Sequence, residues 1–215
     1  RSGKLNFYIS REIACDAETG KHDRAVRSRQ AVSGRAARCS DSGSLSCTGQ
    51  NLPMELMSFP ARLESLALED ADRLAVTCLD SSLTRRQLQS AATRLGRTLQ
   101  GLGVGVGDYV TVSLPNSTDW FVAYVACWMI GAVPQPTSAK LPPRELAAIV
   151  ELAKSKVVIG APDSAVDLLP PTAKILPLNY QTDPSLSDAP LPDATSPAWK
   201  APTSGGSTGR PKLIV

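Results

Sequence analysis

Histidine is almost missing from this 215-residue chain, whose single copy is His22. A Ser–His or Cys–His nucleophilic pair would have to use this residue, which lies in a polar segment without apolar periodicity, so hydrolase chemistry of that type is excluded. The five cysteines are scattered and include no C-x-x-C pair, which excludes the usual zinc sites. We therefore predict no metal site and assign no catalytic side chain.

Long apolar segments are also missing. The longest uncharged apolar run covers residues 120–138, and its helical part, residues 120–133, falls short of the ~20 residues that span a bilayer. No signal peptide stands at the start. Cys78 and Cys127 fall within predicted regular elements, where buried and reduced thiols are usual. These thiols lead us to expect a reducing, cytoplasmic setting.

A strong charge of one sign is absent as well, because the formal net charge is only +3. No stripe of Lys and Arg with interleaved aromatic residues appears, so a nucleic-acid partner is not expected. Residues 1–53 carry nine Lys or Arg against five Asp or Glu and show no apolar periodicity. We predict that residues 1–56 are disordered or a non-native leader, and that one domain covers residues 57–215.

Apolar patterns of helix and strand type alternate from residue 57 onward. Helices are predicted over residues 60–70, 84–100, 117–130, 142–153 and 164–169, and strands over residues 74–79, 109–114, 157–160 and 174–178. This alternation predicts an α/β fold with a mostly parallel sheet flanked by helices. The polar, proline-rich residues 179–202 are predicted to form a loop.

The predicted helices carry recognisable starts and faces. Thr84 and Ser117 have the chemistry of N-terminal caps. Arg85 and Arg86 are predicted to occupy a solvated helix face. Four aromatic residues at helical spacing are predicted to pack in the core: Trp120, Phe121, Tyr124 and Trp128.

A glycine- and hydroxyl-rich segment over residues 203–212 is the strongest functional signal. Glycine lets the backbone approach an anion closely, successive amides form a nest of donors, and a lysine adds a cation. The spacing fits neither a Walker loop nor a dinucleotide fingerprint, and the continuation into Arg-Pro-Lys-Leu-Ile-Val argues against a flexible linker. The predicted phosphate-binding residues are Ser204, Gly205, Gly206, Ser207, Thr208, Gly209 and Lys212.

This segment resembles the phosphate loop of the AMP-forming acyl-adenylate superfamily, which holds acyl-CoA synthetases, peptide-synthetase adenylation domains and luciferases. Residues 114–117 and 128–136 are similar to the LPNS … W-x-x-GAV-x-x-P segment of the acid–CoA ligases. Residues 83–88 resemble the LT-x-x-QL opening of the family's first long helix. The three motifs occur in the family's order, so we expect residues 57–215 to be the N-terminal portion of the large adenylate-forming domain, truncated after the phosphate loop.

The chain departs from the family pattern at a few positions. Gly205 stands where the family usually has Ser or Thr, and Leu213 stands where many members have Gly. The residues before the loop, 199–202, are poorly suited to the apolar strand that usually leads into it. The aromatic-Thr-Glu magnesium motif and the Thr-Gly-Asp ribose motif do not occur among the 215 residues.

The resemblance implies a ligase that consumes ATP with Mg²⁺, activates a fatty, aromatic or steroid carboxylic acid as its adenylate, and transfers the acyl group to coenzyme A. It implies that Lys212 lies near the β- and γ-phosphates, and that Ser207 and Thr208 contact phosphate oxygens. We expect this chain to be inactive by itself. Two alternatives stay open: an adenylation domain of a peptide synthetase, and a non-catalytic remnant that serves as an interaction module.

Overall fold

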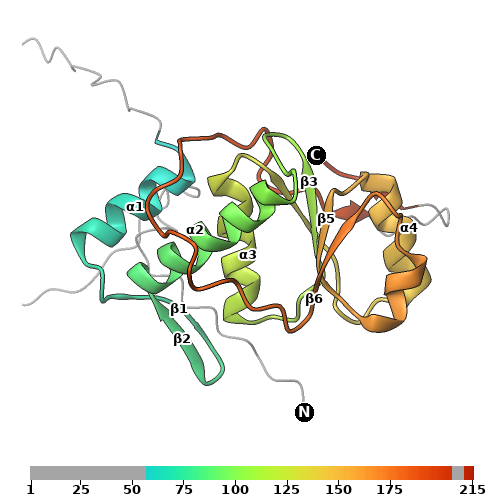
Figure 1. The fold of residues 1–215 in the computed structure, drawn as a ribbon, viewed down its shortest axis with the longest axis horizontal. Coiled ribbons are helices and arrows are strands. Elements are labelled where there is room, and N and C mark those ends of the chain that lie inside the picture. The colour runs from blue at the N-terminus through green and yellow to red at the C-terminus, as the bar shows by residue number, and fades with distance from the viewer. Residues whose placement is uncertain (1–56, 205–210) are drawn as a thin grey trace, which may run out of the picture.

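A computed structural model describes residues 57–204 and 211–215. The predicted leader, residues 1–56, lies outside the described residues. Figure 1 shows a central sheet with helices on both sides. In chain order the elements are α1 (Phe59–Glu69), β1 (Leu74–Cys78), β2 (Ser81–Thr84), α2 (Arg85–Gly101), β3 (Tyr109–Val112), α3 (Thr118–Met129), β4 (Val133–Pro136), α4 (Pro143–Ala153), β5 (Val157–Ala161), the short 3-10 helix η1 (Asp163–Leu168), β6 (Lys174–Pro177), β7 (Thr203–Ser204) and β8 (Lys212–Leu213).

The central sheet has the strand order β4-β3-β5-β6, and every neighbouring pair in it is parallel. This confirms the predicted α/β fold. Helices α2 and α3 pack against one face through Val110 and Val157, whereas α4 and η1 pack against the other through Val158. Both faces are therefore covered. For this reason the polar Thr111, between the apolar residues of β3, is as fully buried as they are.

The helix starts agree closely with the predicted caps. The Thr84 hydroxyl accepts a hydrogen bond from the amide of Gln87, and the Gln87 Oε1 atom accepts one from the Thr84 amide, which completes a capping box. Ser117 caps α3 by accepting from the amide of Trp120 at 3.3 Å. Along α4 the apolar residues at helical spacing form the inward face, since Leu146, Ile149, Val150 and Ala153 are all buried.

Four strands escaped prediction: β2, β4 and the two short strands β7 and β8. Strand β2 pairs antiparallel with β1 in a hairpin that projects beside α2 (Figure 1). Strand β4 contains Pro134 and Pro136, which lack the amide hydrogens that a central strand needs. The structure places β4 at the edge of the sheet, where one side of the strand has no ladder partner and prolines are tolerated.

The prediction that Arg85 occupies a solvated helix face is wrong. Its exposed fraction is only 9%. Its Nη1 atom donates to the carbonyl oxygen of Leu66 at 2.8 Å, so the guanidinium ties the first turn of α2 to the last turns of α1. The neighbouring Arg86 has an exposed side chain, as predicted. The spacing of the arginines does not reveal this difference, because it depends on where α1 lies.

The glycine-rich connection between α2 and β3 is held by one carboxylate. The Oδ2 atom of Asp108 accepts from the Gly105 amide at 2.7 Å and pairs with the Lys156 ammonium at 2.7 Å. The same ammonium donates to the carbonyl oxygen of Gly103 at 3.1 Å. Asp108 therefore links the turn before β3 to the turn before β5.

Replacing Asp108 with alanine is expected to lower the free energy of unfolding by about 1–2 kcal/mol, because a charge-assisted hydrogen bond and a half-exposed ion pair are both lost. Urea denaturation measures this change. Asp72→Ala is the control, since Asp72 pairs with Arg86 only at 3.9 Å and is 90% exposed. An Asp108→Ala loss no larger than the Asp72→Ala loss would contradict the expectation.

Candidate functional site

The phosphate-loop segment begins and ends in a short antiparallel pair. Strand β7 pairs with β8 so that Ser204 lies opposite Lys212. The Ser204 Oγ atom lies 3.5 Å from the Lys212 carbonyl oxygen, at the outer limit of a hydrogen bond. Lys212 is exposed. Of the predicted binding residues, the structure thus brings the first hydroxyl and the lysine together at the base of the loop.

The remaining predicted binding residues lie outside the described residues: Gly205, Gly206, Ser207, Thr208 and Gly209. Their binding roles stay predictions. The residues on either side of this segment belong to one hairpin ladder, in which Ser204 pairs with Lys212. A seven-residue connection of this composition can turn several backbone amides toward one anion.

The hairpin is attached to the edge of the central sheet. The Ala201 amide donates to the carbonyl oxygen of Pro134 in β4 at 3.0 Å, and Ala201 is completely buried. On the other arm, the Ile214 amide donates to the carbonyl oxygen of Pro202 at 2.9 Å. The described ends of the segment, β7 and β8, are therefore attached beside β4.

Trp199 leads into the loop and was missed by the sequence analysis. Its ring stacks on Trp128 with 4.2 Å between ring centroids, and Phe59 packs edge-on against both rings. The Trp128 Nε1 atom donates to the Trp199 carbonyl oxygen at 2.9 Å. Tyr124 and Trp128 are buried in the core as predicted, and Trp120 and Phe121 pack against it. An aromatic residue inside a Pro- and Ser-rich stretch has no periodic neighbours that would predict its partner.

A buried polar network joins three parts of the sheet and was also missed. Gln135 in β4 is fully buried, and its Oε1 atom accepts from the hydroxyls of Thr111 and Ser155. These two hydroxyls are themselves 2.7 Å apart. The Gln135 Nε2 atom is buried without a hydrogen-bond partner. A network of this kind favours one pairing of β3 with β4, since a shift of register would separate the groups.

The described cysteines are unsuited to nucleophilic catalysis. Cys78 and Cys127 are both buried and unpaired, as predicted. Burial raises the pKa of the Cys127 thiol well above its usual range, so it stays neutral near pH 7. Burial, with a smaller effect from Cys127, also raises the pKa of Tyr124. Among residues 57–204 and 211–215, no group of three or more His, Cys, Asp or Glu residues could hold a metal ion.

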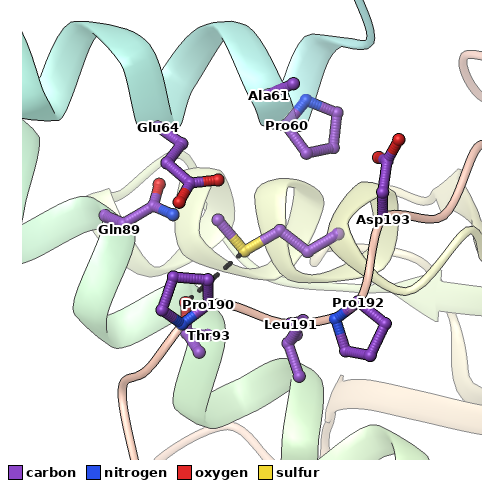
Figure 2. A pocket seen from close by; sticks show the side chains of 10 residues that line it. Pro60, Ala61, Glu64, Gln89, Thr93, Pro190, Leu191, Pro192 and Asp193 are labelled. Atoms are coloured by element: carbon purple, nitrogen blue, oxygen red, sulfur yellow. Dashed lines mark hydrogen bonds between the residues drawn. The ribbon is translucent and has the colours of Figure 1, made fainter.

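A cavity of about 250 Å³ lies between α1, α2, the end of α3 and residues 190–193 (Figure 2). Glu64 and Gln89 lie at one side of it and Asp193 at the other, while the Thr93 hydroxyl donates to the Met129 sulfur at 3.8 Å. Two carboxylates line the cavity without any lysine or arginine. Such a lining repels a triphosphate, so this cavity is not a candidate nucleotide site. In the described part of the chain, no helix is long and apolar enough to span a membrane.

Known proteins are similar to this chain in sequence and in fold. A nonribosomal peptide synthetase, sidC of Arthroderma benhamiae, is 28% identical over 184 residues, which cover 77% of this chain and 4% of that protein. The 3-hydroxybenzoate–CoA/4-hydroxybenzoate–CoA ligase of Thauera aromatica is 31% identical over 119 residues, which cover 55% of this chain and 21% of the ligase. This chain therefore spans only a small part of these relatives.

A solved structure agrees with the sequence relatives. The crystal structure of the nonribosomal peptide synthetase FmoA3 in its AMPPNP-bound form has a TM-score of 0.63 and 26% identity to this chain, and the match covers 76% of this chain and 17% of FmoA3. The family described as AMP-binding enzyme matches residues 63–215. This match covers more than half of the chain and includes all three motifs identified in the sequence. The chain therefore belongs to the AMP-binding enzyme family.

Proposed function

We propose that this chain supplies the ATP-binding loop of an enzyme that activates a carboxylic acid as its acyl-adenylate. The observation that carries the proposal is the pairing of Ser204 with Lys212, which closes a glycine- and hydroxyl-rich loop at its base. The base is attached to the sheet edge through Ala201 and Pro134. An exposed lysine at the end of a segment rich in glycine and hydroxyl residues has the chemistry of a polyphosphate site.

The loop would act on the leaving group of the reaction. A carboxylate oxygen of the acid forms a bond to the α-phosphorus of ATP, and the bond from that phosphorus to the bridging oxygen of the β-phosphate breaks, which releases pyrophosphate. The Lys212 ammonium and the loop amides would hold the β- and γ-phosphates while negative charge develops on the departing pyrophosphate. Mg²⁺ would arrive bound to ATP and spread the same charge. Positioning and charge neutralisation supply most of the catalysis in such transfers.

For the second step we propose that the thiol of coenzyme A displaces AMP from the acyl-adenylate. The similarity to the hydroxybenzoate–CoA ligase supports this acceptor. The similarities to sidC and FmoA3 give equal support to the rival acceptor, the phosphopantetheine thiol of a carrier protein in a peptide synthetase. Reading the gene past the codon for Val215 separates the two, because a following carrier domain with its modified serine would favour the peptide synthetase.

Titration of the isotope-labelled chain with Mg-ATP tests the proposal by nuclear magnetic resonance. We expect the amide signals of Ser204 to Lys212 to shift, and Mg-tripolyphosphate to move the same signals because the phosphates are the part recognised. Unchanged signals at these residues would favour the non-catalytic interaction module instead. We expect no ATP–pyrophosphate exchange from residues 1–215 alone with fatty, aromatic or steroid acids. Measurable exchange would contradict that expectation.

A further inference from the structure

Residues 186–201, called the strap below, cross over α2 on their way from β6 to the phosphate-loop hairpin (Figure 1). The strap contains neither a helix nor a strand. Its backbone carbonyls and amides therefore need partners outside regular secondary structure. Side chains of α2 and α3 supply the partners of four strap carbonyl oxygens, those of Leu186, Ser187, Ala189 and Trp199, so these contacts help to set the path of the strap.

Two arginines of α2 bind the first carbonyls of the strap. Arg97 donates from Nε to the Ser187 carbonyl oxygen and from Nη2 to that of Ala189, both at 2.8 Å. Arg94 donates from Nε to the Leu186 carbonyl oxygen at 2.9 Å. A planar guanidinium presents its donors in a fixed fork, so the two Arg97 bonds fix the direction of the strap as well as its distance from α2.

A cluster of three side chains, Ser90, Arg94 and Asp188, also holds the start of the strap against α2. The Ser90 hydroxyl donates to Oδ2 of Asp188 at 2.7 Å, and Arg94 pairs with the same oxygen at 3.1 Å. Arg94 also donates to the Ser90 hydroxyl at 2.8 Å. Ser90 and, to a smaller extent, Arg94 lower the pKa of the Asp188 carboxyl, which is therefore ionised near pH 7.

Beyond this point three residues of the strap, spaced three apart, lie over glycines. The pairs are Leu191 over Gly96, Ala194 over Gly131 and Pro197 over Gly107. A Cβ atom added to these glycines would stand 2.9, 3.3 and 3.9 Å, in that order, from the strap side chains. A repeat of three is that of a polyproline II chain, and this stretch contains Pro190, Pro192 and Pro197. Because these three glycines have no side chain, the strap can pack closely against the domain.

The strap ends at the loop itself. The Trp199 carbonyl oxygen accepts from Trp128, and the Ala201 amide donates to Pro134. Only Pro202 and Thr203 separate Ala201 from Ser204. A displacement of the strap along α2 would therefore move the first arm of the phosphate-loop hairpin.

We propose that the strap is a positioning element for the phosphate loop, and that Arg97 and Gly96 are its main positioning residues. The ligand-binding part of this inference rests on the proposed function. The structural part, that α2 contacts set the position of Trp199 to Ser204, does not.

The test compares Arg97→Ala with the unaltered chain. In the absence of any ligand we expect shifted amide signals at Trp199, Ala201 and Ser204, because the fork to Ser187 and Ala189 is gone. We also expect the dissociation constant for Mg-tripolyphosphate to rise roughly threefold or more. For Arg97→Lys we expect signal shifts and a dissociation constant between those of Arg97→Ala and the unaltered chain, since an ammonium can bind one carbonyl but cannot reproduce the fork. Arg144→Ala is the charge-matched control, because Arg144 lies exposed on α4.

Gly96→Ala provides a second variant that does not remove a charge. Its new Cβ must displace the Leu191 side chain, while alanine favours the helix, so the domain should stay folded. Gly101→Ala is its matched control in the same helix, because nothing lies within 4 Å of a Cβ there. We expect shifted signals at Leu191 and Ser204 for Gly96→Ala and none for Gly101→Ala.

The outcomes separate the two proposals. A lower melting temperature for Arg97→Ala with unchanged signals from Trp199 to Ser204, or Gly96→Ala signals equal to those of Gly101→Ala, would overturn the strap inference. An unaltered chain that shows no response to Mg-ATP or Mg-tripolyphosphate would instead overturn the proposed function. The ligand-free signals would then still decide whether the strap positions the loop.

Discussion

Gly160→Ala is expected to lower the free energy of unfolding by about 2–5 kcal/mol, although it adds only a single methyl group. Gly160 lies within the buried strand β5 and has a φ of +83°, which L-residues with a side chain rarely adopt. An added Cβ would stand 2.9 Å from the backbone oxygen of Ser113 and 2.6 Å from Leu114 Cδ2. The leucine can move, but the backbone oxygen belongs to the segment that continues β3 and cannot.

Thermal or urea unfolding measures this loss, and Gly101→Ala is again the control. Gly101 is the last residue of α2, has no atom near its missing Cβ, and should gain up to about 1 kcal/mol from the better helix former. Similar stability for the two variants would contradict the expectation. It would mean that the turn at Gly160 relaxes without cost, although the register of β5 with β6 shifts between Ile159 and Ala161 at this point.

Helices α2 and α4 could be predicted because their signals are local. The Thr84 cap and the spacing of Leu88, Leu95 and Leu99 follow from residues within a few turns of each other. The inward face of α4 follows from spacing in the same way. The strand β4 could not be predicted, because its prolines are compatible with a strand only at a sheet edge, and edge position depends on the whole topology.

The contacts of Arg85 and Arg97 show why some of the interactions that position the candidate site could not be predicted from the sequence. Arg97 binds carbonyls about ninety residues further along the chain, and no local pattern distinguishes it from a solvated arginine. Arg85 likewise depends on the position of α1. The Ser204 to Lys212 motif, in contrast, is contiguous in the sequence, so its composition alone predicts a phosphate site. The pairing of β7 with β8 brings the two ends of this motif together. Its attachment to Pro134 was not predictable, because it depends on that edge strand.

Lys212→Met is expected to weaken Mg-ATP binding by about 10- to 100-fold, the equivalent of the 1.5–3 kcal/mol that a hydrogen bond to a charged group contributes. Methionine keeps most of the length of the side chain and removes the cation. Lys212 is exposed at the base of the loop, so the melting temperature should not change. Isothermal titration with Mg-ATP and with Mg-tripolyphosphate measures the loss.

The matched control for this prediction is Lys200→Met, because Lys200 is an exposed lysine twelve residues earlier, on the arm that leads into the loop. If general attraction between a basic surface and an anion explained binding, the two variants would lose affinity equally, and the loss would disappear at high salt. If Lys212 contacts phosphate oxygens directly, its loss persists at high salt, and Lys212→Arg recovers part of the affinity because the charge is kept while the donor geometry changes. Equal dissociation constants for Lys212→Met and the unaltered chain would exclude a phosphate contact at this residue and would leave the loop without its only described cation.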